Sequence, residues 1–415
     1  MIIKITDRLK YWGQLLLLPV YWLSFLFPRN KKIWLFGSTF GRRFADNPRY
    51  LYLYVSQHKE ELGVRPIWIS HNQKVVDMLN DEGYEAYMYH SLKGIWLALR
   101  AKIYLFDNYS KDINFWQSCG ATKVNLWHGI PLKKIQHDNN FDKFRHPKNL
   151  WEKIKNYPRN ISDEKPSHYV LTTSENLKPI FSSAFQTDNV LVAGYPRNEV
   201  LISDEIQNVY SEEEKRDKKR IKSFLENKSD CKKKRMIFYM PTFRQSENLF
   251  FDNFYKDDFQ MFLKENNMLF CVKLHPKSKL NKEFENIQSE NIMVINKEAD
   301  PYVFLKMADV LITDYSSIYF DYLLLDRPII FFDYDLEEYL NDSREMYFDY
   351  DEFTPGAKVK DYGELKESIL NAVSMDRDYQ REYSEFRKNI KNKVFEYTNS
   401  EKVLEIIKLI NDIKT

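Results

Sequence analysis

Short apolar runs alternate with helix-like segments along most of this chain, and that alternation limits the folds it can adopt. Between residues 33 and 200 the connecting segments, such as 48–58 and 73–82, have helical spacing. Parallel strands need long crossover connections, which are usually helices. The sequence therefore predicts a parallel sheet with helices on both faces. The runs expected to form its strands are IWLFG, RPIWIS, YEAYMY, KIYLFD, TKVNLWHG, HYVLTT and NVLVAG.

A second series of the same kind begins after residue 235, beyond a stretch dominated by charge. A chain of 415 residues is too long for one ordinary core. We therefore predict two α/β domains with a cleft between them. The strands of the second series are RMIFYMP, MLFCVKLHP, NIMVIN, DVLITD and RPIIFF. The predicted boundaries are 1–30 for an apolar N-terminal segment, 31–202 for the first domain, 203–235 for the charged junction, 236–385 for the second domain and 386–415 for a C-terminal helix.

The N-terminal segment is almost wholly apolar between residues 11 and 27, with Pro19 in its middle and basic residues after it. It is short for a helix that spans a bilayer, which needs about 20 apolar residues, and no small-residue cleavage site follows it. Its aromatic residues suit a headgroup region, and its basic flank suits an anionic cytoplasmic leaflet. We predict a membrane-surface anchor over residues 1–30, and hence a peripheral protein on the cytoplasmic side of the cell membrane. The alternative is a helix buried in the protein's own core.

The charges of the chain nearly cancel. The 62 basic and 60 acidic residues leave a net charge of +2, which gives no electrostatic support for nucleic-acid binding. Cys119, Cys231 and Cys271 are far apart and lack CxxC spacing, which indicates neither a disulfide framework nor a zinc site. The sequence contains no acidic cluster with metal-ligand spacing and no GxGxxG or Walker pattern. We therefore expect no protein-bound metal, no cofactor and a reduced, cytosolic environment.

A histidine follows one of the predicted strands of the first domain, in the stretch NLWHGIPLKK over residues 125–134. His128 ends an apolar run, Gly129 and Pro131 break the strand, and two lysines follow. A loop of this kind can deprotonate a hydroxyl beside an anionic group. The same residues also suit an ordinary turn whose histidine is hydrogen-bonded, and this stretch alone does not decide between the two.

Polar residues also follow the first two strands of the second domain. In an open parallel sheet, ligands bind at the carboxyl ends of the strands. Thr242 and Arg244 come after IFYM, and a guanidinium there suits a bidentate hold on phosphate, although a surface arginine is the alternative. Lys273 and His275 fall on the same side of the next strand end. Two such groups are costly to bury without an anion, which favours a binding role.

The strongest signal runs from the strand DVLITD into a helical pattern. Thr313, Asp314, Ser316 and Ser317 share one turn, at a predicted helix start where free N–H groups attract phosphate. Serine also caps helices for purely structural reasons, but four such residues are more than capping needs. Asp321, one turn further on, can accept hydrogen bonds from ligand hydroxyls; alternatively it is simply an acid favoured in a first helical turn.

Two further segments follow predicted strands. Arg197, in GYPRN, comes after NVLVA and would lie near the domain junction; the alternative is a surface arginine that stabilises a hinge. Residues 333–356 are rich in tyrosines and acids and end in Thr-Pro-Gly. This loop can close over a ligand, although Pro-Gly is also ordinary turn chemistry.

Taken in order, these motifs resemble the CDP-glycerol glycerophosphotransferase family, the teichoic acid primases and polymerases of bacterial cell-wall synthesis. The resemblance covers roughly residues 33 to 360, and the ordered set is specific although no single motif is. Ile130 departs from the family pattern, in which threonine follows the His-Gly pair, and this puts a hydroxyl contact there in doubt. The motifs are DNPRYLYLYV, NLWHGIPLKKI, GYPRNEVL, MPTFR, VKLHP, DVLITDYSSIYFDYLLLDRPIIFFDYD and TPG.

The resemblance implies a GT-B-like fold, with two Rossmann-like domains facing a central cleft. The acceptor and membrane side is N-terminal and the nucleotide side is C-terminal. It also implies that an acceptor hydroxyl attacks the alditol-bearing phosphorus of a CDP-alditol and expels CMP. The acceptor would be a polyprenyl-diphosphate-linked saccharide or polymer at the membrane surface. Phosphoryl transfer needs positioning and charge neutralisation, which the cationic residues described above can supply.

Site residues follow from the same resemblance, residue by residue. His128 looks like the general base that takes the proton from the attacking hydroxyl. Lys133 and Lys134 are expected to attract acceptor phosphates or the anionic membrane. The residues that look like CDP-glycerol contacts are Gly129, Ile130, Pro131, Leu132, Arg197, Thr242, Arg244, Lys273, His275, Thr313, Asp314, Ser316, Ser317 and Asp321.

Other functions remain open from the sequence. The donor can be CDP-glycerol or CDP-ribitol, which would make the protein a ribitolphosphotransferase, and addition of one unit or of many is equally compatible with the chain. A GT-B glycosyltransferase that uses a sugar nucleotide would share the fold. A membrane-associated scaffold without catalytic activity is the other alternative.

Overall fold

The structure is a computed structural model of the chain. It describes residues 11–163, 167–227, 233–243, 256–342, 345–374, 377–397 and 406–410. The chain divides into two compact units. Unit 1 consists of Met1–His128, Ile135–Val209 and Phe395–Thr415, and unit 2 consists of Gly129–Lys134 and Tyr210–Val394.

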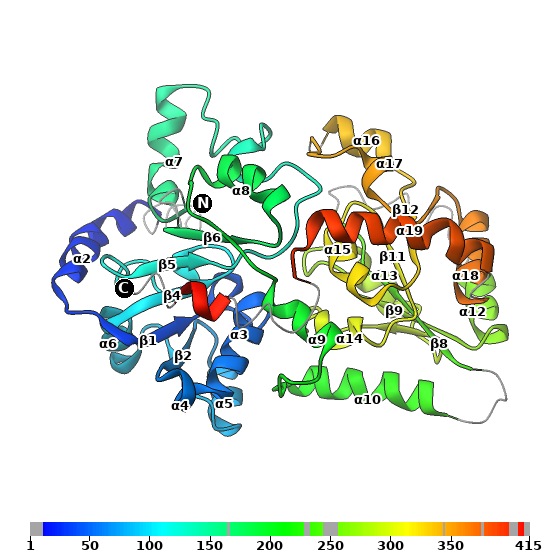
Figure 1. The fold of residues 1–415 in the computed structure, drawn as a ribbon, viewed down its shortest axis with the longest axis horizontal. Helices are drawn as coiled ribbons and strands as arrows, with labels where there is room; N and C mark the ends of the chain where they lie inside the picture. The colour runs from blue at the N-terminus through cyan, green and yellow to red at the C-terminus, as the bar shows by residue number, and fades with distance from the viewer. Residues whose placement is uncertain are drawn as a thin grey trace. The chain divides into compact units, whose positions relative to one another are not determined.

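Unit 1 is built on a seven-stranded sheet in the order β3-β2-β1-β4-β5-β6-β7 (Figure 1). All its strand pairs are parallel, which confirms the predicted α/β class. The later parts of the central strands, Ile33–Phe36 of β1 and Ile103–Phe106 of β4, are buried on both faces and are continuous apolar runs instead of alternating ones. The strands are β1 (Asn30–Phe36), β2 (Arg65–Ser70), β3 (Ala86–Met88), β4 (Ala101–Phe106), β5 (Thr122–Asn125), β6 (Tyr169–Thr172) and β7 (Val190–Val192).

The connections of unit 1 are mostly helical, as the crossover rule requires. Helix α3 (Asp46–Gln57) is buried from Asn47 to Val55 and has no solvated face over that stretch; its buried polar residues Asn47 and Arg49 donate to backbone carbonyls. The other helices are α2 (Leu18–Leu23), α4 (Lys59–Leu62), α5 (Gln73–Asp81), α6 (Leu92–Arg100), α7 (Leu150–Asp163), α8 (Lys178–Phe185) and α9 (Glu199–Ile202). The 3-10 turns are η1 (Gln14–Leu17), η2 (Ser24–Leu26), η3 (Thr39–Gly41), η4 (Ser110–Asp112), η5 (Gln136–Asp138), η6 (Glu175–Leu177) and η7 (Pro196–Asn198).

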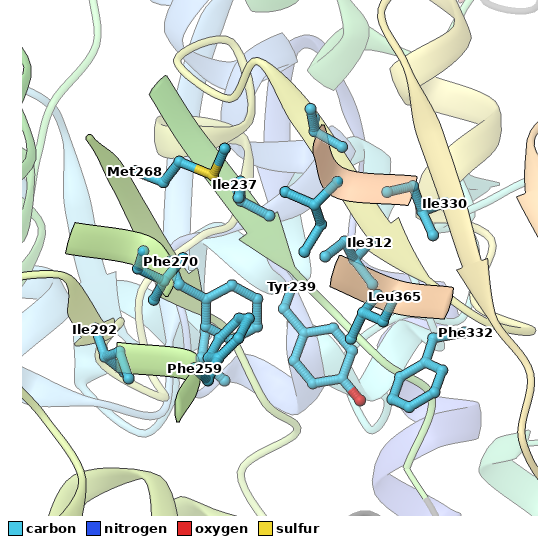
Figure 2. Packing of buried hydrophobic residues seen from close by; sticks show 14 of the residues in the cluster. Ile237, Tyr239, Phe259, Met268, Phe270, Ile292, Ile312, Ile330, Phe332 and Leu365 are labelled. Carbon is cyan, nitrogen blue, oxygen red and sulfur yellow. The ribbon is translucent and has the colours of Figure 1, made fainter. Parts of the chain in front are cut away.

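Unit 2 contains a six-stranded parallel sheet in the order β10-β9-β8-β11-β12-β13. Its core packs Ile237, Phe270, Ile312 and Ile330 of the sheet against helix residues that include Phe259 (Figure 2). All five are fully or almost fully buried, as expected of strands covered on both faces. The strands are β8 (Arg235–Tyr239), β9 (Met268–Val272), β10 (Ile292–Val294), β11 (Val310–Thr313), β12 (Ile329–Phe332) and β13 (Ala357–Val359).

The charged stretch after residue 203 folds mainly into helix α10 (Glu212–Glu226) of unit 2. A capping box between Ser211 and Glu214 begins this helix. Glu214 is itself buried, and its carboxylate also accepts from the N–H of Asp300, 2.9 Å away, which offsets the cost of burial. The other helical elements are α12 (Lys256–Glu265), α13 (Leu280–Asn286), α14 (Tyr302–Leu305), α15 (Ile318–Tyr322), η8 (Leu323–Leu325), α16 (Leu336–Asp342), α17 (Tyr350–Phe353), α18 (Tyr362–Ser374) and α19 (Arg377–Val394).

The apolar N-terminal segment forms short helical turns over η1, α2 and η2. Within the described ranges, no helix is long and apolar enough to cross a membrane. Tyr21 is buried and stacks on Phe115, with ring centres 4.7 Å apart. Leu16, Trp22 and Leu26, in contrast, are exposed. The segment therefore packs on unit 1 along one side and leaves apolar side chains uncovered on the other.

Candidate active site

The loop that carries His128, residues 125–134, begins where β5 ends. We call it the histidine loop, and side-chain amides hold its backbone. Asn125 accepts a hydrogen bond from the N–H of Trp127 at 2.9 Å. Asn47, at the start of α3, donates to the carbonyls of Leu126 (3.0 Å) and Trp127 (2.8 Å). Trp127 has a φ of 53°, a left-handed conformation that a bulky residue rarely adopts. Such strain persists only where the surroundings fix it, so the direction in which His128 leaves the strand is set by its neighbours.

The imidazole of His128 is oriented by a backbone carbonyl. Its Nδ1 lies 2.9 Å from the carbonyl oxygen of Asp107, just beyond β4. A carbonyl can only accept a hydrogen bond, so Nδ1 carries the proton and, in the neutral ring, Nε2 has the lone pair. The ring also packs on Trp127, with centres 3.9 Å apart. This tautomer is the one that a base acting through Nε2 needs.

Two buried acids lie beside this loop. The carboxylate of Asp107 accepts from the Ser38 hydroxyl at 2.7 Å and from the Thr39 N–H at 3.0 Å. Burial raises the pKa of Asp107, and the neighbouring charge of His128 lowers it in part. Burial, followed by the charge of Asp107, also raises the pKa of Asp112 well above its usual range. The carboxyl groups of Asp107 and Asp112 are therefore part of the buried surroundings that hold this loop.

The rest of the loop belongs to unit 2. The carbonyl of Leu132 accepts from the N–H of Tyr347 at 2.9 Å, and Lys133 forms an antiparallel bridge with Met346. Lys134 pairs with Glu345 through both its backbone N–H (2.8 Å) and its ammonium group (2.9 Å). The predicted contacts in this loop, Gly129, Ile130, Pro131 and Leu132, are all buried, whereas His128 is half-buried. The chain thus changes unit directly after His128.

Arg197 lies in the turn η7 and is buried. Its guanidinium pairs with Asp46, with Nη1 2.8 Å from Oδ1. Its N–H donates to the side chain of Asn47 at 3.2 Å, the same residue that holds the histidine loop. The structure therefore connects the predicted base and Arg197 through one asparagine of unit 1.

Several predicted contacts meet at the carboxyl edge of the unit 2 sheet. The Thr242 N–H donates to both carboxylate oxygens of Asp314, at 2.9 and 3.0 Å. The Thr313 hydroxyl donates to the carbonyl of Met240 at 2.8 Å. These bonds tie the ends of β8 and β11 together. Arg244 lies outside the described residues.

The two serines of the Thr-Asp-Tyr-Ser-Ser turn are half-buried before α15. Ser317 occupies the N-cap position but its hydroxyl makes no capping hydrogen bond. Structural capping, the alternative explanation for these residues, is therefore not what the Ser317 hydroxyl does here. Ser316 and Ser317 remain the predicted phosphate contacts.

Lys273 and His275 have different environments. Lys273 is buried and its ammonium group donates to the carbonyl of Lys297 at 2.9 Å. His275 is exposed, its ring lies 5.0 Å from that of Phe243, and its Nδ1 accepts from the N–H of Lys277 at 3.2 Å. Of the pair, His275 is the one that a ligand can reach without a rearrangement.

Comparison with known proteins identifies the family. A model of the CDP-glycerol:poly(glycerophosphate) glycerophosphotransferase family matches residues 20–410. The chain belongs to this family. A teichoic acid poly(glycerol phosphate) polymerase of Bacillus spizizenii is 28% identical over 88% of the chain and 90% of its own length. A polymerase of the same description from Staphylococcus epidermidis is 30% identical over 85% of the chain, which spans only 47% of that protein.

Solved structures agree on the fold of this glycerophosphotransferase family member. The structure of the wall teichoic acid polymerase TagF superimposes with a TM-score of 0.70 at 23% identity. The match covers 100% of this chain and 98% of the TagF chain. The family model confirms the predicted resemblance, and the structural match shows that the two α/β units share the TagF fold.

Two glycerophosphotransferase motifs have a structural role in this chain. Asp321 is fully buried and accepts from the hydroxyl of Tyr302 at 2.5 Å, so its predicted contact with a ligand hydroxyl stays a prediction. In the Thr-Pro-Gly motif, a Cβ on Gly356 would lie 2.2 Å from the carbonyl oxygen of Ile329. That position accepts only glycine because β12 approaches it too closely.

Sequence reasoning missed two residues of the histidine site. Asn47 holds both the loop and the Arg197 turn, and Asp107 supplies the carbonyl that orients the ring. Asp107 ends the strand-like run KIYLFD, so its place at a carboxyl edge was visible in the sequence. The role of its backbone carbonyl was not, because a backbone contact leaves no side-chain signal.

Proposed function

We propose that this protein transfers glycerol phosphate from CDP-glycerol to a hydroxyl of a lipid-linked acceptor and releases CMP. Membership of the glycerophosphotransferase family supports the reaction class. The observation that carries the proposal is the orientation of His128, whose Nδ1 is committed to the Asp107 carbonyl. A family member that presents Nε2 as the basic nitrogen at a strand end has the group that the reaction requires.

The proposed step is a displacement at phosphorus. The acceptor oxygen forms a bond to the phosphorus that carries glycerol, and Nε2 of His128 takes the hydroxyl proton. The bond from that phosphorus to the bridging oxygen breaks, and its electron pair leaves with CMP. Positioning and charge neutralisation account for most catalysis in such transfers, and the residues at the carboxyl edge of the unit 2 sheet are proposed to hold the donor.

We also propose that unit 1 binds the membrane surface from the cytoplasmic side. Helix α7 supports this, because four exposed apolar residues follow one another at spacings of one, three and three. They therefore share one face of the helix. Trp151 is 73% exposed, which is unusual for a large aromatic side chain in water. The four residues are Leu150, Trp151, Ile154 and Tyr157.

The N-terminal segment adjoins α7. The hydroxyl of Tyr11 donates to the carbonyl of Lys155 at 2.8 Å, and Tyr21 shares a buried cluster with Ile161 of α7. Figure 1 shows α2 and α7 at the same end of unit 1. We propose that exposed apolar residues of the two elements belong to one surface, which we name the apolar face; they are Val20, Trp22 and Leu23 of α2 and Leu150, Trp151, Ile154 and Tyr157 of α7. Such a face suits the boundary between headgroups and acyl chains, where a polyprenyl-linked acceptor would lie.

The test of the reaction is CMP release with a lipid-linked acceptor and each candidate donor in turn. The purified protein should release CMP from CDP-glycerol and release no UDP from UDP-sugars. Mass spectrometry of the product should show the added glycerol phosphate and the number of units. Faster turnover of CDP-ribitol than of CDP-glycerol would make ribitol phosphate the transferred group. Release of CMP from neither CDP-alditol would refute the proposed function.

A further inference from the structure

Two buried oxygen atoms of unit 2 have no hydrogen-bond partner among the residues that the structure describes. They are Oδ1 of Asp333 and the hydroxyl oxygen of Tyr350. The two residues are only 2% and 6% exposed. An unpaired buried polar atom destabilises a fold, so the needs of folding do not explain either residue.

Both atoms lie at the carboxyl edge of the sheet, beside the serine turn. Asp333 directly follows β12, and its N–H donates to the carbonyl of Val359 at 3.1 Å. Tyr350 begins α17, and its ring centre lies 5.7 Å from that of Tyr315. Tyr315 directly precedes Ser316. Because β12 pairs with β11, which the serine turn follows, both residues belong to the same part of the sheet edge as the predicted phosphate contacts, where ligands bind in open α/β sheets.

The chemistry of the pair favours a neutral ligand group that both donates and accepts. Burial, and after it the charge of Asp333, raises the pKa of Tyr350, so its hydroxyl stays protonated and can donate. A carboxylate accepts hydrogen bonds and repels phosphate. Tyr334 is half-buried and Asp351 is exposed, which places the pair just beneath the surface.

We propose that Asp333 and Tyr350 form a subsite for a hydroxyl group of the donor. The ligand hydroxyl donates to Oδ1 of Asp333 and accepts from the Tyr350 hydroxyl. This inference rests on the proposed function, in which unit 2 holds a CDP-alditol. Two parts of that donor carry hydroxyls, the ribose and the alditol, and both present the same chemistry to the pair.

The test measures dissociation constants by titration calorimetry for the full-length protein and for the variants Asp333→Asn and Tyr350→Phe. Each substitution removes one proposed hydrogen-bonding group and keeps the side-chain shape. The probes are CDP-glycerol, CMP and 2′,3′-dideoxy-CMP, which lacks both ribose hydroxyls. We expect each variant to bind CDP-glycerol about 10-fold more weakly, as for a lost hydrogen bond to a buried polar group.

Matched controls come from the opposite edge of the same sheet. Asp309 pairs with Arg235 at 2.8 Å, and the hydroxyl of Tyr322 donates to the carbonyl of Ala308 at 2.9 Å. Asp309→Asn and Tyr322→Phe should lower Tm and leave CDP-glycerol affinity unchanged. Asp333→Asn and Tyr350→Phe should bind CDP-glycerol more weakly without a loss of Tm, because Oδ1 of Asp333 and the Tyr350 hydroxyl have no partner within the described protein.

The probes separate the two sources of the hydroxyl. Weaker binding of CDP-glycerol alone assigns the contact to the alditol. Weaker binding of CDP-glycerol and CMP, with dideoxy-CMP unaffected, assigns it to the ribose. Unchanged affinity for CDP-glycerol, or an equal loss for dideoxy-CMP, overturns the subsite while the proposed function stands. Failure of the unmodified protein to bind CDP-glycerol refutes the proposed function itself.

Discussion

The Nδ1 atom of His128 is 2.9 Å from the carbonyl oxygen of Asp107, which leaves Nε2 as the basic nitrogen of the ring. If Nε2 takes the proton of the acceptor hydroxyl, His128→Ala should lower kcat by at least about 100-fold, the usual contribution of a general base. The dissociation constant of CDP-glycerol should change little, because a base acts on the transition state. CMP release and calorimetry measure the two quantities.

His90 provides the matched control for this prediction. It is an exposed histidine of unit 1 that follows β3, so His90→Ala should keep full turnover. Full turnover by the His128→Ala variant would show that His128 is not the general base. Loss of donor affinity without loss of kcat would instead make His128 a binding residue.

The buried ion pair between Arg197 and Asp46 leads to a second prediction. Arg197→Met leaves a carboxylate that is only partly exposed without this partner, so the free energy of unfolding should fall by about 3 kcal/mol. Thermal and denaturant unfolding measure the loss. Asp46→Asn, which keeps a hydrogen-bond acceptor for the guanidinium, should cost less.

Calorimetry with CDP-glycerol then separates the two roles of Arg197. A structural role leaves the dissociation constant of the folded variant unchanged. If Arg197 contacts the donor, as the family resemblance implies, the variant should have a higher dissociation constant for CDP-glycerol. A variant with unchanged stability would show that the pair with Asp46 contributes nothing, contrary to the prediction.

The pattern of the sequence was sufficient to predict the two parallel sheets. Runs such as those of β1 and β4 are apolar at every buried position, which only strands covered on both faces require. The exposed stripe of α7 could also have been predicted, since its apolar residues recur at helical spacing. These features are local, and local pattern is what a single sequence records.

Long-range and backbone relations were not predictable in the same way. The bridge between Lys133 and Met346 joins residues that are far apart in the chain, and no local pattern marks it. The burial of Lys273 and its bond to the Lys297 carbonyl depend on where a neighbouring loop passes. The sequence could therefore predict that the candidate residues lie at strand ends. It could not predict which groups they hydrogen-bond.

Asp333 predicts a pH dependence of stability. Burial raises its pKa to about 6 in the folded protein, above the value of about 4 expected in an unfolded chain. Between these values the folded state binds more protons than the unfolded state, so the contribution of this group to stability falls as pH rises from about 4 to about 6. Above that window the charged carboxylate continues to destabilise the fold.

Asp333→Asn removes this titration. The variant and the natural protein should have similar Tm values near pH 4, and the variant should be the more stable by a few degrees at pH 7.5. Fluorimetric melting curves across the pH range measure the difference. A constant difference between the Asp333→Asn and natural proteins at all pH values would contradict the raised pKa.

The apolar face of unit 1 predicts membrane binding that a surface substitution can abolish. Trp151 and Ile154 point outward from α7 and contribute little to the core, so the double variant Trp151→Glu/Ile154→Glu should keep its Tm. It should lose most binding to vesicles that contain anionic lipid, because it removes buried apolar area and adds negative charge at the headgroups. Vesicle co-sedimentation measures the change.

Met261, 62% exposed on α12 of unit 2, is the control: Met261→Glu should bind like the unmodified protein. Equal binding by the double variant would place the membrane contact elsewhere, and Leu23→Glu/Leu26→Glu would then test whether the N-terminal turns suffice on their own.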